Sequence, residues 1–298
     1  MAYAIEHGER LSAAIPRIVI ERIDTAREQL LDETETPAER IHNARKRFKE
    51  SRAVVRLIRF ALGNQFAVEN TWFRDAGRDL ATLRDADAVL EALAKLEETA
   101  AGFHERRVLR RLRRRLAHAR RRTAAADLVG RIDSTAAQLT VARARVTVWP
   151  ALGDEFSTIG AGLRRTYRDG ARAFQHAVIE RTPESFHEFR KRVKDHWYHA
   201  QLLRHIWPEF MRSYRDQLEQ LSGALGDRHD LDVLRQIVVE RGNFGTPFDL
   251  RVLHGIIDER VAELSGRAAT IAERIYAEAP DAMHNRFESY WTVWTGRS

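Results

Sequence analysis

Several residue types are scarce or missing in this 298-residue sequence, and each shortage excludes a class of protein or site. Without cysteine, the chain has no disulfides, thiolate metal sites or cysteine nucleophiles. Seven prolines and 16 glycines are few for this length, which favours long helices over a loop-rich β fold. No stretch approaches the roughly 18 uncharged apolar residues of a membrane helix, and residues 1–10 lack the apolar run of a signal peptide. We therefore expect a soluble, cytoplasmic protein that uses no membrane.

Lysine is the next scarce residue, and its distribution is uneven. The chain holds five lysines, namely Lys46, Lys49, Lys95, Lys191 and Lys194. Arginine carries the remaining positive charge, and the net charge is +7 with a sequence pI of about 10.0. A basic balance of this size indicates an anionic partner: nucleic acid, an anionic membrane or a polyphosphorylated molecule. Composition alone does not choose among these three.

Four of the five lysines belong to a motif that occurs twice. Residues 41–49 (IHNARKRFK) and 186–194 (FHEFRKRVK) share an apolar residue, His, two free positions, Arg-Lys-Arg, an apolar residue and Lys. The offset between the two histidines is 187 − 42 = 145. The Asp-x-Asp pairs at 85–87 and 230–232 have the same offset. Two motifs at one offset indicate a tandem duplication of a unit of about four helices, with halves at 1–148 and 149–298.

Apolar spacing predicts an all-α fold. We expect helices over 10–31, 36–62, 68–99 and 103–122, and then over 156–179, 182–207, 210–239 and 247–277. Thr36-Pro37 and Thr182-Pro183 begin two of them, since a hydroxyl caps the helix and proline fits its first position. Residues 124–149 are predicted to connect the halves, with helical stretches. Trp291 and Trp294 are expected to anchor the tail.

Each motif helix places cations on one face. Positions 0, +3, +7, +10 and +14 align on a helix, which selects His42, Arg45, Lys49, Arg52 and Arg56, and then His187, Arg190, Lys194, Trp197 and Gln201, with Arg204 one step further. Cations about one turn apart, close to 5.4 Å, suit a linear polyanion. A solvated charged face is the alternative, disfavoured because residues 40–49 contain no carboxylate and the pattern occurs twice. Whether the histidines are protonated phosphate ligands or neutral residues at the helix start stays open.

Further arginines form helical stripes outside the motif. The 103–122 helix carries Arg106, Arg107, Arg110, Arg111, Arg113, Arg114, Arg115, Arg120, Arg121 and Arg122. Arg251, Arg260 and Arg267 match Arg106, Arg115 and Arg122 at the 145 offset, and Arg164, Arg168 and Arg172 form another stripe. A solubilising surface explains such stripes equally well. Among these matched pairs we take Arg106 and Arg251 as the better candidates for ligand contact.

Two other functions deserve comparison with polyanion binding. A phosphohydrolase would assemble a divalent metal site from Asp85, Asp87, His229, Asp230 and Asp232, with His187 and Asp258 nearby in sequence. Arg84 replaces His229 in the first half, however, so we favour carboxylates that pair with arginines of the neighbouring helix. No Walker phosphate loop and no Gly-x-Ser-x-Gly motif is present. A sequence-independent nucleic-acid binder is disfavoured because Trp197 is the only aromatic residue on the cationic stripe.

The two His-x-x-Arg helices, the Asp-x-Asp segments that follow them and the helical duplication together resemble the CHAD family, the conserved histidine α-helical domain. The resemblance covers nearly the whole chain. It implies two antiparallel four-helix bundles related by a pseudo-two-fold axis, with the motif helices facing a shared basic cavity. It also implies binding of inorganic polyphosphate. We expect this binding to be non-catalytic and to involve no metal or cofactor. Association with polyphosphate granules or with polyphosphate-metabolising enzymes is implied as well.

Carried over by position, the resemblance assigns ligand contacts to His42, Arg45, Lys46 and Lys49, and to His187, Arg190, Lys191 and Lys194. Trp197 and Gln201 depart from the pattern, because the first half has Arg52 and Arg56 there. The complete predicted site is His42, Arg45, Lys46, Lys49, Arg52, Arg56, His187, Arg190, Lys191, Lys194, Arg204, Arg106, Arg251, Arg168 and Arg172.

Overall fold

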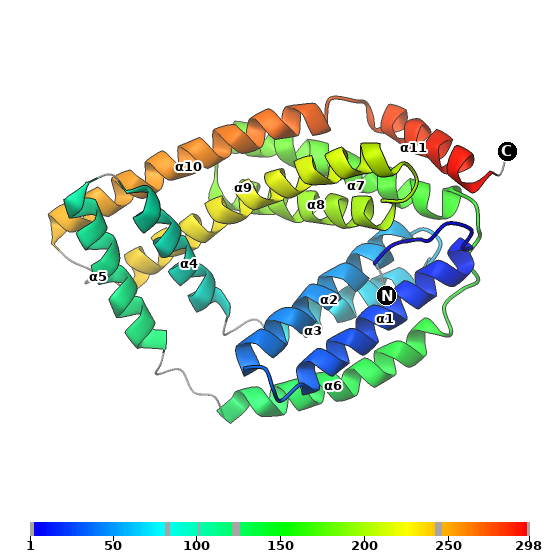
Figure 1. Ribbon diagram of the computed structural model, residues 1–298, viewed down its shortest axis with the longest axis horizontal. Coiled ribbons are helices and arrows are strands. Elements are labelled where there is room, and N and C mark those ends of the chain that lie inside the picture. The colour runs from blue at the N-terminus through cyan, green and yellow to red at the C-terminus, as the bar shows by residue number, and fades with distance from the viewer. Residues whose placement is uncertain (1–2, 81–83, 101, 121–125, 242–245, 297–298) are drawn as a thin grey trace.

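The computed structural model describes residues 3–80, 84–100, 102–120, 126–241 and 246–296, without the side chains of 84–88, 118–120, 126–128 and 241. Eleven helices and no strand occur in these ranges, which confirms the predicted all-α fold (Figure 1). The helices are α1 (Leu11–Leu31), α2 (Pro37–Leu57), α3 (Gln65–Asp79), α4 (Arg84–Thr99), α5 (Phe103–Arg120), α6 (Ala126–Val146), α7 (Ser157–Glu180), α8 (Pro183–Leu202), α9 (Pro208–Arg241), α10 (Pro247–Ile275) and α11 (Pro280–Thr295).

Both motif helices begin at the predicted Thr-Pro pairs. At the start of α2, the Glu39 N–H donates to Thr36 Oγ1 at 3.4 Å, and the Thr36 N–H donates to a Glu39 carboxylate oxygen at 3.1 Å. At the start of α8, the Ser185 N–H donates to Thr182 Oγ1 at 3.2 Å. These bonds satisfy N–H groups that lack a partner within the first helical turn. The local sequence therefore determines where each motif helix starts.

Some predicted boundaries were wrong. The helix predicted over 68–99 is two helices, because the backbone of Leu80 leaves the helical region after α3 (φ −91°, ψ 7°) and α4 begins at Arg84. Apolar spacing continues across this break and no proline marks it, so the pattern gave no sign of it. Helix α2 ends at Leu57 rather than near Leu62. Within the predicted connection over 124–149, residues Ala126–Val146 form the regular helix α6, and the tail folds as α11.

The motif helices meet where two groups of helices join. Helix α1 packs on α2 and α6, and α2 packs on α3; in the other group α7 packs on α8 and α11, and α9 packs on α8 and α10. Helix α2 also contacts α7 and α8, so the two groups share one continuous apolar core (Figure 1). At this junction a Cβ added to Gly162 of α7 would overlap the carbonyl oxygen of Leu57 at the end of α2. Glycine is therefore required there for the two backbones to approach.

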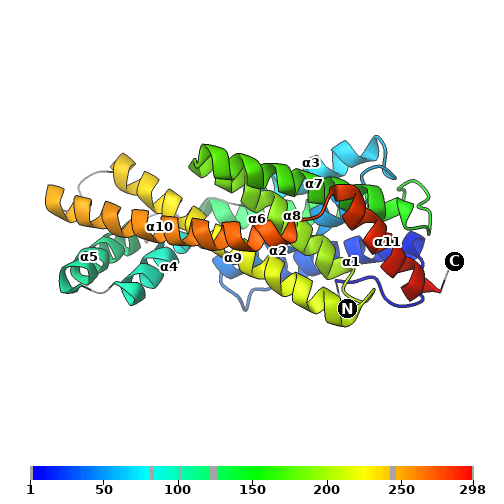
Figure 2. The same cartoon turned by 90° about the horizontal axis from the view of Figure 1, so that it is seen from above.

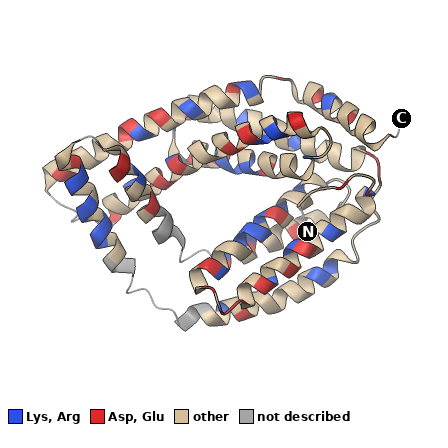
Figure 3. Cartoon of the chain, in the orientation of Figure 1, with Lys and Arg blue, Asp and Glu red and all other residues tan. Residues whose placement is uncertain are grey.

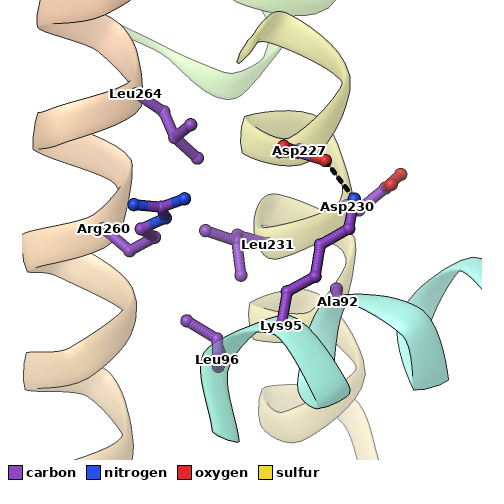
Figure 4. Close-up of a pocket in the computed structure, with 8 residues that line it drawn as sticks. All are labelled: Ala92, Lys95, Leu96, Asp227, Asp230, Leu231, Arg260 and Leu264. Carbon is purple, nitrogen blue, oxygen red and sulfur yellow. Dashed lines mark hydrogen bonds and ion pairs between the residues drawn. The ribbon is translucent and has the colours of Figure 1, made fainter. Parts of the chain in front are cut away.

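The α4–α5 hairpin lies away from the other first-half helices. Helix α4 packs against α9, and α5 packs against α10, at one end of the elongated molecule (Figure 2). The Lys95 ammonium of α4 donates to Asp227 of α9 at 2.6 Å, beside Leu231 and Leu264 (Figure 4). An apolar contact and an ion pair thus join this hairpin to the second half of the sequence. Among the described residues, no helix is long and apolar enough to cross a membrane.

Candidate anion-binding site

A cavity of about 340 Å³ opens between α2, α3 and α8, and cationic side chains dominate its wall. Its lining residues are Arg45, Phe48, Lys49, Arg52, Phe73, Arg74, Gly77, Arg78 and His187. Phe48 and Phe73 are buried and form the apolar base, while a Cβ at Gly77 would lie 3.9 Å from the Phe48 ring. The cavity joins α2 to the first turns of α8, which lie far apart in the sequence.

Four predicted residues line this one cavity: Arg45, Lys49 and Arg52 from α2, and His187 from α8. The two cations from α3, Arg74 and Arg78, were not predicted as site residues. Their positions do not belong to the duplicated pattern, since Glu219 and Gly223 stand 145 residues further on. Their i,i+4 spacing on an amphipathic helix was the available signal, but many solvated helix faces have the same spacing.

One side-chain oxygen, that of Asn70, holds both Arg52 and Arg56. Arg52 Nε donates to the Asn70 side-chain oxygen at 3.0 Å, and Arg56 Nε donates to the same oxygen at 3.2 Å. Arg56 also forms an ion pair with Asp195 of α8, which ties the two motif helices together. The sequence pattern placed Arg56 on the ligand-binding face; in the structure its guanidinium is paired to a carboxylate. Asn70 positions both guanidinium groups without neutralising either.

The surroundings of Arg52 disfavour the charged form of its guanidinium. The pKa of Arg52 is lowered to about 10, first by burial and then by the positive charges of Arg56, Arg74 and Arg192, with Asp195 opposing them in part. Like charges held together in a partly buried site repel one another, and an anion placed between them relieves that repulsion. The site is therefore electrostatically prepared for a polyanion.

The motif histidines differ in their surroundings. The His187 ring packs against the His229 ring of α9, with centroids 4.4 Å apart and planes at 36°. Burial, with Lys191 and Arg190 nearby, lowers the pKa of His187, and burial with Arg190, His187 and Arg228 nearby lowers that of His229 to about 4. Both rings are therefore neutral at pH 7. His42 is partly buried on α2.

The second motif continues along α8 beside this cavity. Arg190 lies next to α9, because a Cβ at Gly226 would be 3.7 Å from its Nε. The Lys194 ammonium lies over the Trp197 ring, 4.3 Å from the centroid, in a cation–π contact. Lys191 is half-exposed and pairs with Glu188. Trp197, which stands where the first half has Arg52, thus contacts Lys194 of the second motif.

The remaining predicted residues lie elsewhere. Lys46 is exposed on α2, and Arg204 donates to the Tyr3 carbonyl at 2.9 Å, beyond the end of α8. Arg168 and Arg172 lie on α7, where Arg168 contacts Asp169. Arg106 and Arg251 lie on α5 and α10, outside the α2–α3–α8 cavity. None of these six residues lines that cavity.

Asp232 of the second-half Asp-x-Asp pair engages an arginine. Asp232 accepts from Arg228 at 2.7 Å, and both side chains are buried. Arg228 is four residues earlier on α9 itself, whereas we predicted arginines of a neighbouring helix. Asp258 pairs with Arg235 at 2.5 Å. No group of three or more His, Asp or Glu side chains within metal-binding reach exists among the described residues, and the side chains of Asp85 and Asp87 lie outside them.

Comparison with known proteins agrees with the all-helical fold. The CHAD domain family matches residues 17–239, so the chain belongs to the CHAD domain family. Its structure is similar to one described as the crystal structure of the CHAD domain from the plant Ricinus communis, with a TM-score of 0.52 and 17% identity over 95% of each chain. At that identity the likeness concerns the fold. A comparison with curated protein sequences found no match.

Proposed function

We propose that this CHAD domain binds inorganic polyphosphate in the cavity between α2, α3 and α8. The observation that carries the proposal is the convergence of five cations and His187 on one cavity. Along α2, the positions 45 to 52 extend about 10 Å at 1.5 Å per residue, so one linear chain can contact Arg45, Lys49 and Arg52 in turn. Burial first, and then the positive charges of Arg56, Arg74 and Arg192, lower the pKa of Arg52, and a multivalent anion offsets that repulsion better than a single phosphate does.

We further infer that the chain is an internal duplication whose halves face a shared basic cavity. The starts of α1 and α7, of α2 and α8, and of α5 and α10 differ by 157 − 11 = 146, 183 − 37 = 146 and 247 − 103 = 144. These differences agree within one residue with the motif offset of 145. Three helix pairs in the same order and at nearly one offset support a pseudo-two-fold relation. The proposed ligand then extends from the cations of α2 to those of α8.

A fourfold substitution tests the site. Arg45, Lys49, Arg190 and Lys194 are changed to Ala, and binding of long-chain polyphosphate is measured by titration calorimetry on the full chain. We expect affinity to fall by two orders of magnitude or more, since each lost charge-assisted contact is worth about 1.5–3 kcal/mol. Thermal unfolding monitored by circular dichroism confirms that the variant is folded.

The matched control removes the same charge elsewhere. Arg27, Arg212, Arg267 and Arg274 are exposed and lie outside the cavity, and changing all four to Ala also reduces the net charge from +7 to +3. If both variants bind polyphosphate equally, general electrostatic attraction explains the binding and the assigned site is wrong. The slope of log affinity against log salt is expected to become less negative only in the site variant, because fewer counterions are released.

The proposed role is non-catalytic recruitment, to polyphosphate granules or to enzymes that act on polyphosphate. Incubation with polyphosphate and Mg²⁺ or Mn²⁺ is expected to release no orthophosphate. Release that Asp230→Ala abolishes would instead establish the phosphohydrolase. Granule association is checked by comparing the cellular distribution of the wild-type chain with that of the fourfold site variant.

A further inference from the structure

Helix α5 presents a second cationic surface that shares no residue with the α2–α3–α8 cavity. An open groove of about 650 Å³ runs along it, lined by Phe103, Arg106, Arg107, Arg110, Arg111, Arg114 and Arg115. Among these lining residues there are six arginines and no carboxylate. Arginines accordingly recur along α5, where Figure 3 draws them in blue. We call this surface the α5 groove.

Neighbouring helices orient part of this surface without cancelling its charge. Arg110 donates to Glu97 of α4 at 2.7 Å, and Arg111 to Asp249 of α10 at 3.4 Å. Asp249 also accepts a hydrogen bond from the Thr246 N–H at 3.0 Å, so it takes part in capping the N-terminus of α10 as well. The two carboxylates hold arginines in place across the α4–α5–α10 contact. The groove keeps an excess of cations over carboxylates.

Exposed aromatic rings accompany these cations. Phe103, at the first residue of α5, is 84% exposed, and Phe248, in the first turn of α10, is 54% exposed. The His104 ring, next to Phe103 in the chain, lies 5.0 Å from the Phe248 ring, and the Arg251 guanidinium lies 5.8 Å from the centroid of that ring. An exposed aromatic ring beside guanidinium groups offers a flat apolar face to a base and cations to the adjoining phosphates. Bare polyphosphate has no group that would use the rings.

The apolar side of α5 decides against a membrane. Val108, Leu109, Leu112 and Leu116 are buried against the protein. An interfacial helix needs an apolar face that is free to enter the lipid. The four apolar residues of α5 named above are buried against the protein and do not form such a face. The cations extend from Arg106 to Arg115, about 14 Å at 1.5 Å per residue, which suits a short single strand.

We propose that the α5 groove binds single-stranded nucleic acid without sequence preference, with bases stacked on Phe103 and Phe248 and phosphates held by the arginines. This site is independent of the polyphosphate site proposed above, so each can fail without the other. Binding should be steeply salt-dependent: four phosphate contacts give a slope of about −3 in log affinity against log salt.

The experiment measures fluorescence anisotropy of labelled oligothymidylate and oligouridylate, each of about 16 nucleotides, with the full-length chain at about 50 mM salt. Phe103→Ala should weaken both oligonucleotides about tenfold and Phe103→Trp should restore binding, because stacking is worth about 1–3 kcal/mol per base. Arg107→Gln/Arg111→Gln/Arg114→Gln should weaken them at least thirtyfold. The matched control, Arg212→Gln/Arg267→Gln/Arg274→Gln, removes equal charge from other surfaces and should leave affinity within threefold.

Long-chain polyphosphate and vesicles of anionic lipid serve as the alternative ligands. The proposal is supported if the variant with four Ala substitutions on α2 and α8 binds the oligonucleotides as wild type does, while Phe103→Ala loses that binding. Absence of oligonucleotide binding overturns it, as does equal behaviour of the two arginine triples. Two further results would define a non-selective anion surface and overturn the assignment. One is an unchanged oligonucleotide affinity in Phe103→Ala. The other is an equal loss of polyphosphate and oligonucleotide binding in Arg107→Gln/Arg111→Gln/Arg114→Gln. Vesicle binding that Phe103→Ala removes, without oligonucleotide binding, would assign the groove to membranes.

Discussion

The imidazole rings of His187 on α8 and His229 on α9 lie 4.4 Å apart, centroid to centroid. His187 lines the proposed polyphosphate cavity, while His229 belongs to the second Asp-x-Asp segment. Burial and nearby cations lower the pKa of each ring. The two motifs found in the sequence therefore meet at a pair of neutral histidines beside a cationic cavity.

Polyphosphate affinity is expected to rise as the pH falls from about 7.5 to 5.5. An anion bound beside His187 offsets the effects of Lys191 and Arg190 and raises the ring's pKa, so binding takes up protons. One pKa unit of upward shift corresponds to up to about tenfold in affinity. Calorimetry in buffers of different ionisation enthalpy measures the proton uptake. His187→Gln should flatten the pH dependence, whereas the exposed control His176→Gln should not; an unchanged slope in His187→Gln would contradict a ligand-linked histidine.

The free protein is expected to lose stability over the same acidic range. Burial lowers the pKa of His196 to about 3 and that of His199 to about 4, while the unfolded residues titrate near 6.5. The unfolded state therefore binds protons first, and stability falls as the pH drops below 6.5 until the folded pKa is reached. Each histidine removes about 1 kcal/mol by pH 5.5. Urea unfolding at several pH values measures the trend, and His199→Gln should show a shallower decline than wild type.

Gly162→Ala should destabilise the junction of the two helix groups. The added methyl would overlap the Leu57 carbonyl, and backbone cannot move aside as a flexible side chain can. Overpacking of this kind costs about 1–3 kcal/mol or more, which lowers the melting temperature by several degrees. Gly255→Ala in α10 is the matched control, since nothing lies within 4 Å of its Cβ position and alanine favours helix. Equal melting temperatures for the two variants would show that α2 and α7 are not so closely packed.

Arg145→Ala should destabilise the protein far more than Arg143→Ala. Arg145 donates two hydrogen bonds, at 3.0 and 3.1 Å, to Glu69, whose side chain is fully buried. Removing Arg145 leaves a buried carboxylate without its cation, at a cost of about 3–5 kcal/mol. Arg143 pairs with Asp24 at the exposed surface, where such pairs contribute about 1 kcal/mol or less. Urea titration separates the two; a difference below about 1 kcal/mol would argue against the buried pair.

Substitutions on α3 test the residues that the duplication did not indicate. Arg74→Gln/Arg78→Gln should weaken polyphosphate binding about tenfold, because both cations line the cavity. The effect should diminish at high salt, since both side chains are exposed enough to be screened. Arg267→Gln/Arg274→Gln removes equal charge from α10 and is the control for titration calorimetry. If both double variants bind as wild type does, α3 takes no part in the site.

Local physics made much of this fold readable from the sequence. Apolar spacing identifies most helices, and the Thr-Pro pairs at 36–37 and 182–183 begin α2 and α8 because a cap and a proline act within one turn. The break after Asp79 escaped prediction because its cause is not in the local apolar pattern. The packing of the α4–α5 hairpin on α9 and α10 was equally inaccessible, since adjacency in sequence does not determine which apolar faces meet.

The sequence by itself determined the family and selected the cations Arg45, Lys49 and Arg52, because the first two belong to a duplicated motif and helical spacing places Arg52 on the same face. Only the tertiary structure brought His187 across to them, added Arg74 and Arg78, and directed Arg56 to Asp195 and Arg204 to the Tyr3 carbonyl. Helical periodicity states which side chains share a face, but not what stands opposite that face. Whether an arginine meets a ligand cavity or a carboxylate depends on contacts between residues more than a hundred positions apart.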